Sequence, residues 1–264
     1  MQHPSSNRLT LLALLLLGTV VLVCASLGRW QLNRADERRA ISAEIERGRQ
    51  AAPVDVRSNM TTELVQPWRA ASATGQWAEQ FSVLLDNRNL DGRPGLWLAT
   101  PLIIDSGSAV LVVRGWIPRP IGAEQAPKIE TLTGPQKIEG EISLRVPRLF
   151  ELWTSNKGED SGLPSSWKGI AAAETGWVDT SKLIRVQNLD VSVLSERIGV
   201  KFLPFVLLQY SPAQDGLVRN WPTPSLDADK NVGYATQWFG FAAIALIAFC
   251  GVLWRFARRK RTQN

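Results

Sequence analysis

Two long apolar runs without charged residues lie near the two ends of this chain, at residues 9–28 and 231–254. They hold 20 and 24 residues, and a helix of that length, at about 1.5 Å per residue, spans the roughly 30 Å hydrocarbon core of a membrane. The chain between the runs carries most of the charged residues and has shorter apolar segments, as a folded, water-exposed domain does. The pattern predicts two transmembrane helices that bracket one large domain.

The first run has a second interpretation, as a cleaved signal peptide. Cys24 and Ser26 are small residues with the spacing of a peptidase site. The apolar core of a signal peptide is shorter, about 7–15 residues, and its start is more basic than the single Arg8 makes this one. A membrane span is therefore the preferred interpretation.

The basic residues beside the two runs predict the orientation. Five positive charges and no acid follow the second run, which favours the cytoplasmic side. Four arginines at residues 29–39 favour the opposite orientation, but two acids dilute them and the long domain that follows weakens the rule. We expect a bacterial-type inner (cell) membrane protein with two membrane passes, cytoplasmic ends at 1–8 and 255–264, and an extracytoplasmic domain at 29–230.

The expected domain is mainly β. Ile41 and Ile45 are four residues apart and extend the first helix through the charged stretch to Arg49. Strands are expected at 81–85, 96–104, 110–117, 137–146, 183–186 and 205–210, a short helix at 191–198, and a long loop or lid at 150–177. The fold class is thus an α+β membrane protein in which two transmembrane helices bracket a mainly antiparallel β-barrel or sandwich with short helices.

Charge and residue types exclude several classes of function. Residues 40–230 hold 20 basic and 22 acidic side chains, a net charge of −2, so nucleic acid is not an expected partner. The one histidine is His3, and no CxxC, phosphate-loop, GxGxxG or GxSxG motif is present. Lone acids such as Asp86 and Glu141 are expected to be surface or turn groups. The sequence therefore predicts no metal site and no enzyme.

Three separated motifs are more specific than their surroundings. Residues 27–34 read LGRWQLNR, residues 85–95 read LDNRNLDGRPG and are followed by TPL at 100–102 and LVVRGWIP at 111–118, and residues 233–239 read GYATQWF. Together with the two apolar runs, they resemble the surfeit locus protein 1 family of membrane-bound assembly factors for haem a-containing cytochrome c oxidase. The resemblance covers nearly the whole chain.

The resemblance implies candidate contacts for haem a or a partner protein at eight motif residues: Trp30, Arg34, Asn87, Arg88, Arg114, Trp116, Tyr234 and Trp238. Each also has a structural interpretation. The aromatic residues of the first and third motifs suit a membrane boundary, and Asn87 suits a turn. A bulge at the end of a strand accounts for the Arg-Gly-Trp sequence at 114–116, and a structural or interface role is preferred for both arginines.

In some members of the family, a histidine just before the third motif is associated with binding of haem a. Asn231 occupies that position in this chain, and an amide does not replace imidazole as a haem ligand. The expected function is a non-enzymatic assembly factor and chaperone of respiratory-chain biogenesis that binds oxidase subunits or other assembly factors in the lipid bilayer. Haem a is a possible, transient cofactor. The alternatives are a membrane sensor or receptor that signals through a partner and, with little support, a membrane hydrolase with an acid pair.

Overall fold

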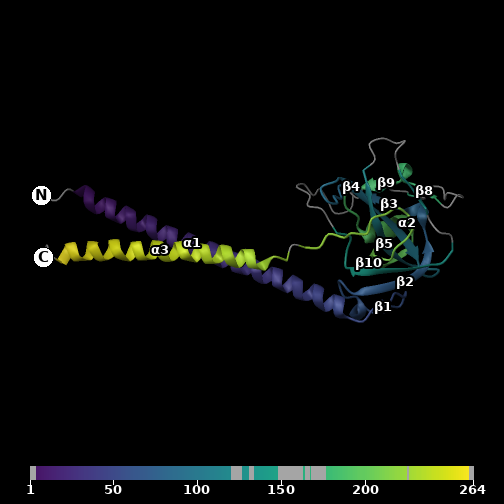
Figure 1. Ribbon diagram of the computed structural model, residues 1–264, viewed down its shortest axis with the longest axis horizontal. Helices are drawn as coiled ribbons and strands as arrows, with labels where there is room; N and C mark the ends of the chain where they lie inside the picture. The colour runs from purple at the N-terminus through teal and green to yellow at the C-terminus, as the bar shows by residue number, and fades with distance from the viewer. Residues whose placement is uncertain are drawn as a thin grey trace. The chain divides into compact units, whose positions relative to one another are not determined.

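The computed structural model describes residues 4–119, 127–130, 134–147, 163, 167, 177–224 and 226–261. The chain forms two compact units. The helical unit combines Met1–Ala43 with Pro224–Asn264, and the barrel unit comprises Glu44–Thr223 (Figure 1).

Two helices build the helical unit, α1 (Pro4–Gln50, whose last turns belong to the barrel unit) and α3 (Ala228–Arg261). They run antiparallel, with the start of α1 and the end of α3 at the same end of the pair (Figure 1). Small residues lie between them: Ala35 and Ala235 are buried, and a Cβ on Gly28 would come within 2.9 Å of the Phe239 ring. Small residues allow two helix backbones to approach closely.

Most other apolar side chains of this pair face outward, with Leu15 71% and Ile247 72% exposed. Both helices are long and apolar enough to cross a membrane by length and composition. The sequence-based expectation of two long apolar helices is confirmed, as is the continuation of the first helix beyond its apolar run.

A closed ring of five strands forms the barrel unit. The ring strands are β2 (Ala70–Trp77), β4 (Gly95–Ile103), β5 (Ser108–Pro118), β7 (Gln136–Ser143) and β10 (Lys201–Gln209). Their order is β2-β7-β10-β5-β4, and the pairing of Trp77 with Leu102 returns β4 to β2. Only β5 and β10 pair in parallel within the ring. A five-stranded Greek-key ring of this kind is the barrel class that includes the OB-fold.

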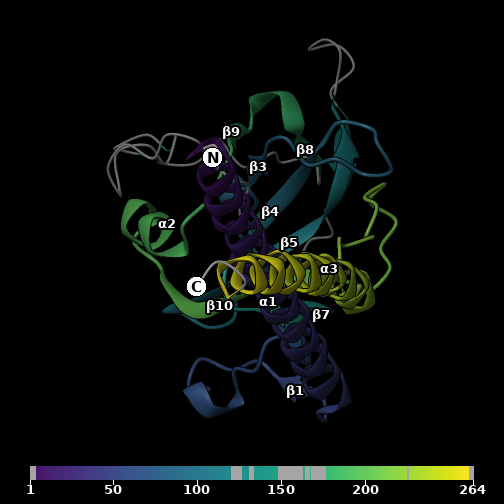
Figure 2. The same cartoon turned by 90° about the vertical axis from the view of Figure 1, so that its left-hand side faces the viewer.

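Shorter elements extend and cover the ring. β1 (Val54–Asp55) pairs with β2, β3 (Val83–Leu85) with β4, β9 (Ile184–Val186) with β3, and β6 (Lys128–Glu130) with β8 (Trp177–Asp179). Within the described residues, 3-10 turns join them at η1 (Thr62–Leu64), η2 (Glu79–Phe81) and η4 (Thr180–Lys182). The helix α2 (Val191–Ile198) lies next to the beginning of β10 (Figure 2).

The ring is buried on two faces. One core cluster takes residues from all five ring strands, including Ala73, Leu102, Val112, Ile138 and Phe205, and fills the ring. A second cluster on the other face of β4, β5 and β10 includes Trp97, Trp116 and Leu194 of α2. Because both faces are covered, β4 and β5 are almost continuously apolar instead of alternating.

Of the two alternatives expected, a mainly antiparallel β-barrel or a sandwich, the structure has a sheet-rich domain with a closed, barrel-like sheet. The expected strands and the helix at 191–198 are present, with ends that shift by a few residues. The final strand was expected to start after Pro204, but it begins at Lys201, and its pairing with β5 is irregular between Phe202 and Val206. Proline is tolerated at such an irregularity. The loop expected at 150–177 lies outside the described residues except for Leu163, Trp167 and Trp177.

Candidate functional site

A β-bulge places Arg114 apart from the regular ladder of β5. Gly115 is opposite Leu98 and Val113 is opposite Ala99, so Arg114 is the additional residue between them. Bulges redirect side chains and often lie next to functional sites. The guanidinium of Arg114 stacks over the Trp77 ring at 4.8 Å, and its side chain is only 4% exposed.

The segment after β10 brings an acid to this arginine. Trp116 exchanges two backbone hydrogen bonds with Val218, of 2.7 and 2.9 Å. Gly115 allows this contact, since a Cβ there would meet the Cβ of Leu217 at 2.6 Å. The result places Asp215 beside Arg114, with Nη2 to Oδ2 at 3.3 Å, and Arg219 donates to the same oxygen at 2.6 Å. The expected bulge at residues 114–116 is therefore present, but it lies inside β5 and not at its end, because β5 continues to Pro118.

Arg88 is the second buried arginine of the motifs. Its Nη2 donates to the carbonyl oxygens of Pro147 and Gln187 at 3.0 Å each, and its guanidinium stacks over Trp97 at 4.8 Å. Burial lowers the pKa of Arg88 to about 10, while the charge of Asp86 opposes that shift. Through these hydrogen bonds, Arg88 links the turn after β3 to the segments that contain Pro147 and Gln187.

Trp116 is buried and connects both motif arginines. Its indole N–H donates to the carbonyl oxygen of Arg88 at 2.6 Å. Asn87, next to Arg88, is exposed in a left-handed conformation with φ of 57°, and its amide oxygen accepts a 2.8 Å bond from Arg119. Trp97 packs edge-to-face on Trp221 at 5.2 Å. The second motif and the segment at 215–221 therefore form one packed cluster.

A cavity of about 260 Å³ opens beside Arg114 at one end of the ring. We call this end, where β2 and β10 finish and β7 begins, the barrel mouth. Its lining residues include Trp77, Arg114, Lys137, Gln209 and Asp215. Burial lowers the pKa of Arg114, and the charge of Asp215 partly offsets this effect.

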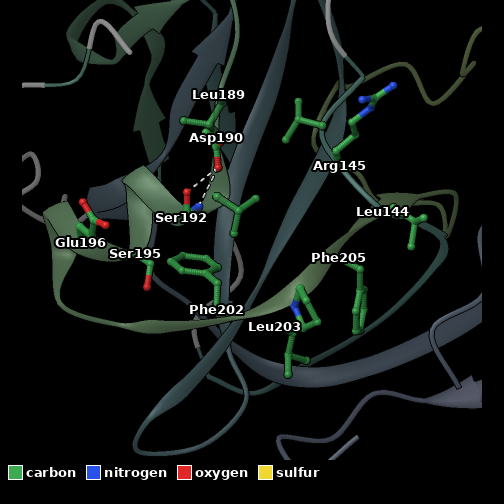
Figure 3. Close-up of a pocket in the computed structure, with 13 residues that line it drawn as sticks. Leu144, Arg145, Leu189, Asp190, Ser192, Ser195, Glu196, Phe202, Leu203 and Phe205 are labelled. Atoms are coloured by element: carbon green, nitrogen blue, oxygen red, sulfur yellow. Dashed lines mark hydrogen bonds between the residues drawn. The ribbon is translucent and has the colours of Figure 1, made fainter. Parts of the chain in front are cut away.

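A larger cavity, of about 490 Å³, lies between α2, the end of β7 and the start of β10. Figure 3 shows Phe202, Leu203 and Phe205 along β10 and the N-terminus of α2, where the Asp190 carboxylate accepts hydrogen bonds from the backbone and hydroxyl of Ser192. Among its described lining residues, no buried polar side-chain atom lacks a hydrogen bond. Its chemistry points to no particular ligand.

The remaining candidate residues lie in the helical unit. The amide nitrogen of Asn231 donates to the side-chain oxygen of Gln31 at 2.6 Å, across the helix pair. Trp30 and Tyr234 are about half exposed, at 54% and 52%. Trp238 packs edge-to-face on Phe241 at 6.1 Å. Arg34 pairs with Glu37 on its own helix at 2.8 Å.

These residues do not fit a histidine-ligated haem. The side chain at position 231 is already engaged with Gln31, and its buried Oδ1 has no hydrogen-bond partner among the described residues. No described group of histidine, cysteine or acidic side chains is arranged to hold a metal ion. Aromatic contact with a flat apolar ligand remains compatible with the exposed rings.

A family model described as the SURF1 family matches residues 18–243, which include parts of both long helices and the whole motif cluster. The chain belongs to the SURF1 family. It is 23% identical over 261 residues to a SURF1-like protein of Mycobacterium tuberculosis (strain ATCC 25618 / H37Rv) described as uncharacterized, covering 96% of this chain and 86% of the relative. A SURF1-like protein of Monosiga brevicollis is 21% identical over 254 residues, 92% of this chain and 86% of that protein.

One matching relative carries a functional name. The cytochrome oxidase assembly protein SHY1 of Saccharomyces cerevisiae is 28% identical over 114 residues, which is 42% of this chain and 29% of SHY1. In this SURF1-family chain, one buried cluster contains Arg88, Arg114 and Trp116. All three side chains make internal contacts within the barrel unit.

Sequence reasoning missed several members of the cluster. Five residues outside the motifs contact or neighbour the motif residues: Asp215, Arg219, Gln209, Trp77 and Trp221. Their pairing depends on contacts between distant segments. The aspartate-glycine turn at 215–216, before an arginine and a tryptophan, was the one local signal.

Proposed function

We propose that this SURF1-family protein is a non-enzymatic assembly factor for a haem a-containing cytochrome c oxidase. The observation that carries the proposal is the family match across residues 18–243, together with the name of the SHY1 relative. The partners would be immature oxidase subunits or other assembly factors, and the protein would hold them at a membrane.

The chemistry of the barrel unit supports a binding role. The two acids considered from the sequence are engaged: Asp86 forms an ion pair with Arg119, and Glu141 pairs with Arg49 at 3.3 Å. Arg88, Arg114 and Trp116 build a rigid cluster whose distant segments are fixed by buried hydrogen bonds. Such a buried cluster supports the surrounding surface residues, which suits recognition of another protein.

We further propose that α1 and α3 both cross the membrane, with both chain ends in the cytoplasm and the barrel unit outside. The antiparallel pairing of the helices and the five basic residues after the second apolar run support this orientation. If the protein takes part in the insertion of haem a, it does so without a histidine at position 231.

Affinity purification separates this proposal from the alternative of a sensor. We expect a tagged protein, cross-linked in membranes that are actively making oxidase, to co-purify with oxidase subunits or oxidase assembly factors. Recovery of a kinase or a transporter, without any oxidase component, would support the sensor instead. The tag belongs after Asn264, beyond the end of α3.

A further inference from the structure

The barrel mouth contains a buried cation that is only partly neutralised. Nη2 of Arg114 donates to Asp215 at 3.3 Å and to the carbonyl oxygen of Glu130 at 3.4 Å. Its Nε and Nη1 atoms are buried and have no hydrogen-bond partner among the described residues. Because Asp215 also pairs with Arg219 at 2.6 Å, one carboxylate serves two guanidinium groups. The trio itself carries a net positive charge, which the negative charge of Glu79 opposes in part at Arg114.

An unsatisfied acceptor, on Gln209, belongs to the lining of the same cavity as these unsatisfied donors. Gln209 follows Leu208, which pairs with Val113, so Gln209 and Arg114 are neighbours on adjacent strands. The amide nitrogen of Gln209 donates to the backbone and hydroxyl oxygens of Ser211, at 3.2 and 3.3 Å. Its Oε1 is buried and has no partner among the described residues. Buried polar groups without a hydrogen-bond partner are unfavourable, so a ligand that satisfies them gains affinity.

The unpaired N–H groups of Arg114 and the unpaired oxygen of Gln209 together specify the chemistry of the ligand. Free N–H groups on a buried cation favour an anion with acceptor oxygens, and a carboxylate forms charge-assisted hydrogen bonds with arginine. The free oxygen of Gln209 requires an N–H donor close to that carboxylate. The last residue of a polypeptide has both groups, on either side of one Cα atom. A haem propionate has a carboxylate but no free N–H beside it.

We infer that the barrel mouth binds the C-terminal carboxylate of a partner polypeptide. Arg114 holds the carboxylate, Gln209 accepts the hydrogen bond of the terminal amide N–H, and Lys137 adds positive charge at the rim. The cavity of about 260 Å³ suits one residue rather than a macrocycle. The inference rests on the proposed function, because the polypeptide would be an oxidase subunit or assembly factor.

N-acetylglycine tests the inference directly, because it has one carboxylate and one amide N–H. The full-length protein in detergent is labelled with ¹⁵N-arginine, and the Nε–H signal of Arg114 is assigned by its loss in Arg114→Lys. We expect N-acetylglycine to shift this signal saturably at millimolar concentrations, whereas neutral N-acetylglycinamide does not. No shift, or equal shifts from both compounds, overturns the inference.

Two variants test the site without removing Arg114. Gln209→Glu is isosteric and places a second carboxylate beside Arg114, so it should weaken N-acetylglycine binding at least tenfold. Asn59→Asp adds the same charge at an exposed position outside the cluster and should leave binding unchanged. If Gln209→Glu fails to fold, Lys137→Glu replaces it, because Lys137 is exposed at the mouth. Unchanged binding in the folded variant overturns the inference.

Oxidase maturation in cells distinguishes failure of this inference from failure of the proposed function. In a strain that lacks the native gene, Gln209→Glu or its replacement should restore less oxidase than wild type, and Asn59→Asp should restore it fully. Full restoration by the mouth variant contradicts the inference, while the rescue itself supports the assembly role. Displacement of N-acetylglycine from Arg114 by haemin contradicts a polypeptide as the source of the carboxylate.

Discussion

The indole nitrogen of Trp116 lies so close to Gly95 that a Cβ atom on this glycine would come within 2.1 Å of it. Gly95 also accepts a backbone hydrogen bond from Arg88 at 3.0 Å, and the same indole donates to the Arg88 carbonyl oxygen. The second motif therefore keeps a glycine here because a tryptophan and an arginine pack against its backbone.

Gly95→Ala should destabilise the barrel unit strongly. Ile117 O would also lie 2.4 Å from the new Cβ, so rigid backbone as well as the ring must move. We expect a loss of about 3 kcal/mol, at the upper end of ordinary overpacking costs, measured by denaturant unfolding followed by tryptophan fluorescence. Gly107→Ala is the control, because nothing lies within 4 Å of its added Cβ. Equal stability of the two variants would contradict the packing described.

Arg114→Ala should impair oxidase maturation more than Arg57→Ala. Removing Arg114 breaks a buried ion pair and its stacking on Trp77, which costs about 3 kcal/mol. Arg57 is exposed, and its replacement should change stability by less than about 0.5 kcal/mol. Oxidase activity at matched protein levels is the measurement. Equal activities would remove the case for a special role of the motif arginine.

The strands that the sequence could predict most readily are those rich in apolar residues. β4 and β5 are buried on both faces and appear as apolar runs, and α1 and α3 as still longer ones. β2 was missed because it is built of small residues. Its Gly75 illustrates the reason: a Cβ there would meet the Ile103 carbonyl oxygen at 2.2 Å, so strand closure requires an atypical strand sequence.

The site was predictable only in part, for a related reason. Arg88, Arg114 and Trp116 were selected because they lie in motifs, and the bulge was expected from the sequence Arg-Gly-Trp. Asp215 is 101 residues from Arg114, and nothing local to either residue specifies their pairing. Gln209 was missed because its role depends on Arg114 in the neighbouring strand, and no residue near it in the sequence indicates that these two are adjacent.

The spectrum of the purified protein tests the interpretation of Asn231. Prepared from membranes that make haem a, the wild-type protein should contain little haem with histidine-ligated spectral character, since Asn231 bonds to Gln31 instead. Asn231→His should retain more haem, and Gln237→His, at an exposed position on the same helix, should not. Stoichiometric low-spin, bis-histidine-like haem in the wild-type protein would contradict this interpretation.

Reporter fusions test the proposed membrane orientation. A reporter that is active only in the cytoplasm should be active when fused after Asn264. Placed in the turn at Gly92, which has φ of 75° and nothing within 4 Å of an added Cβ, it should be inactive. Activity at Gly92 and none after Asn264 would reverse the orientation.

Loss of the gene tests the assembly role most directly. Membranes of a deletion strain of the native host, grown under conditions that require the oxidase, are compared with wild type by haem a absorbance and cytochrome c oxidase activity. Our account predicts that both decrease and that a plasmid copy of the gene restores both. Normal absorbance and activity in the deletion strain, in a host without a second gene of the SURF1 family, would contradict it.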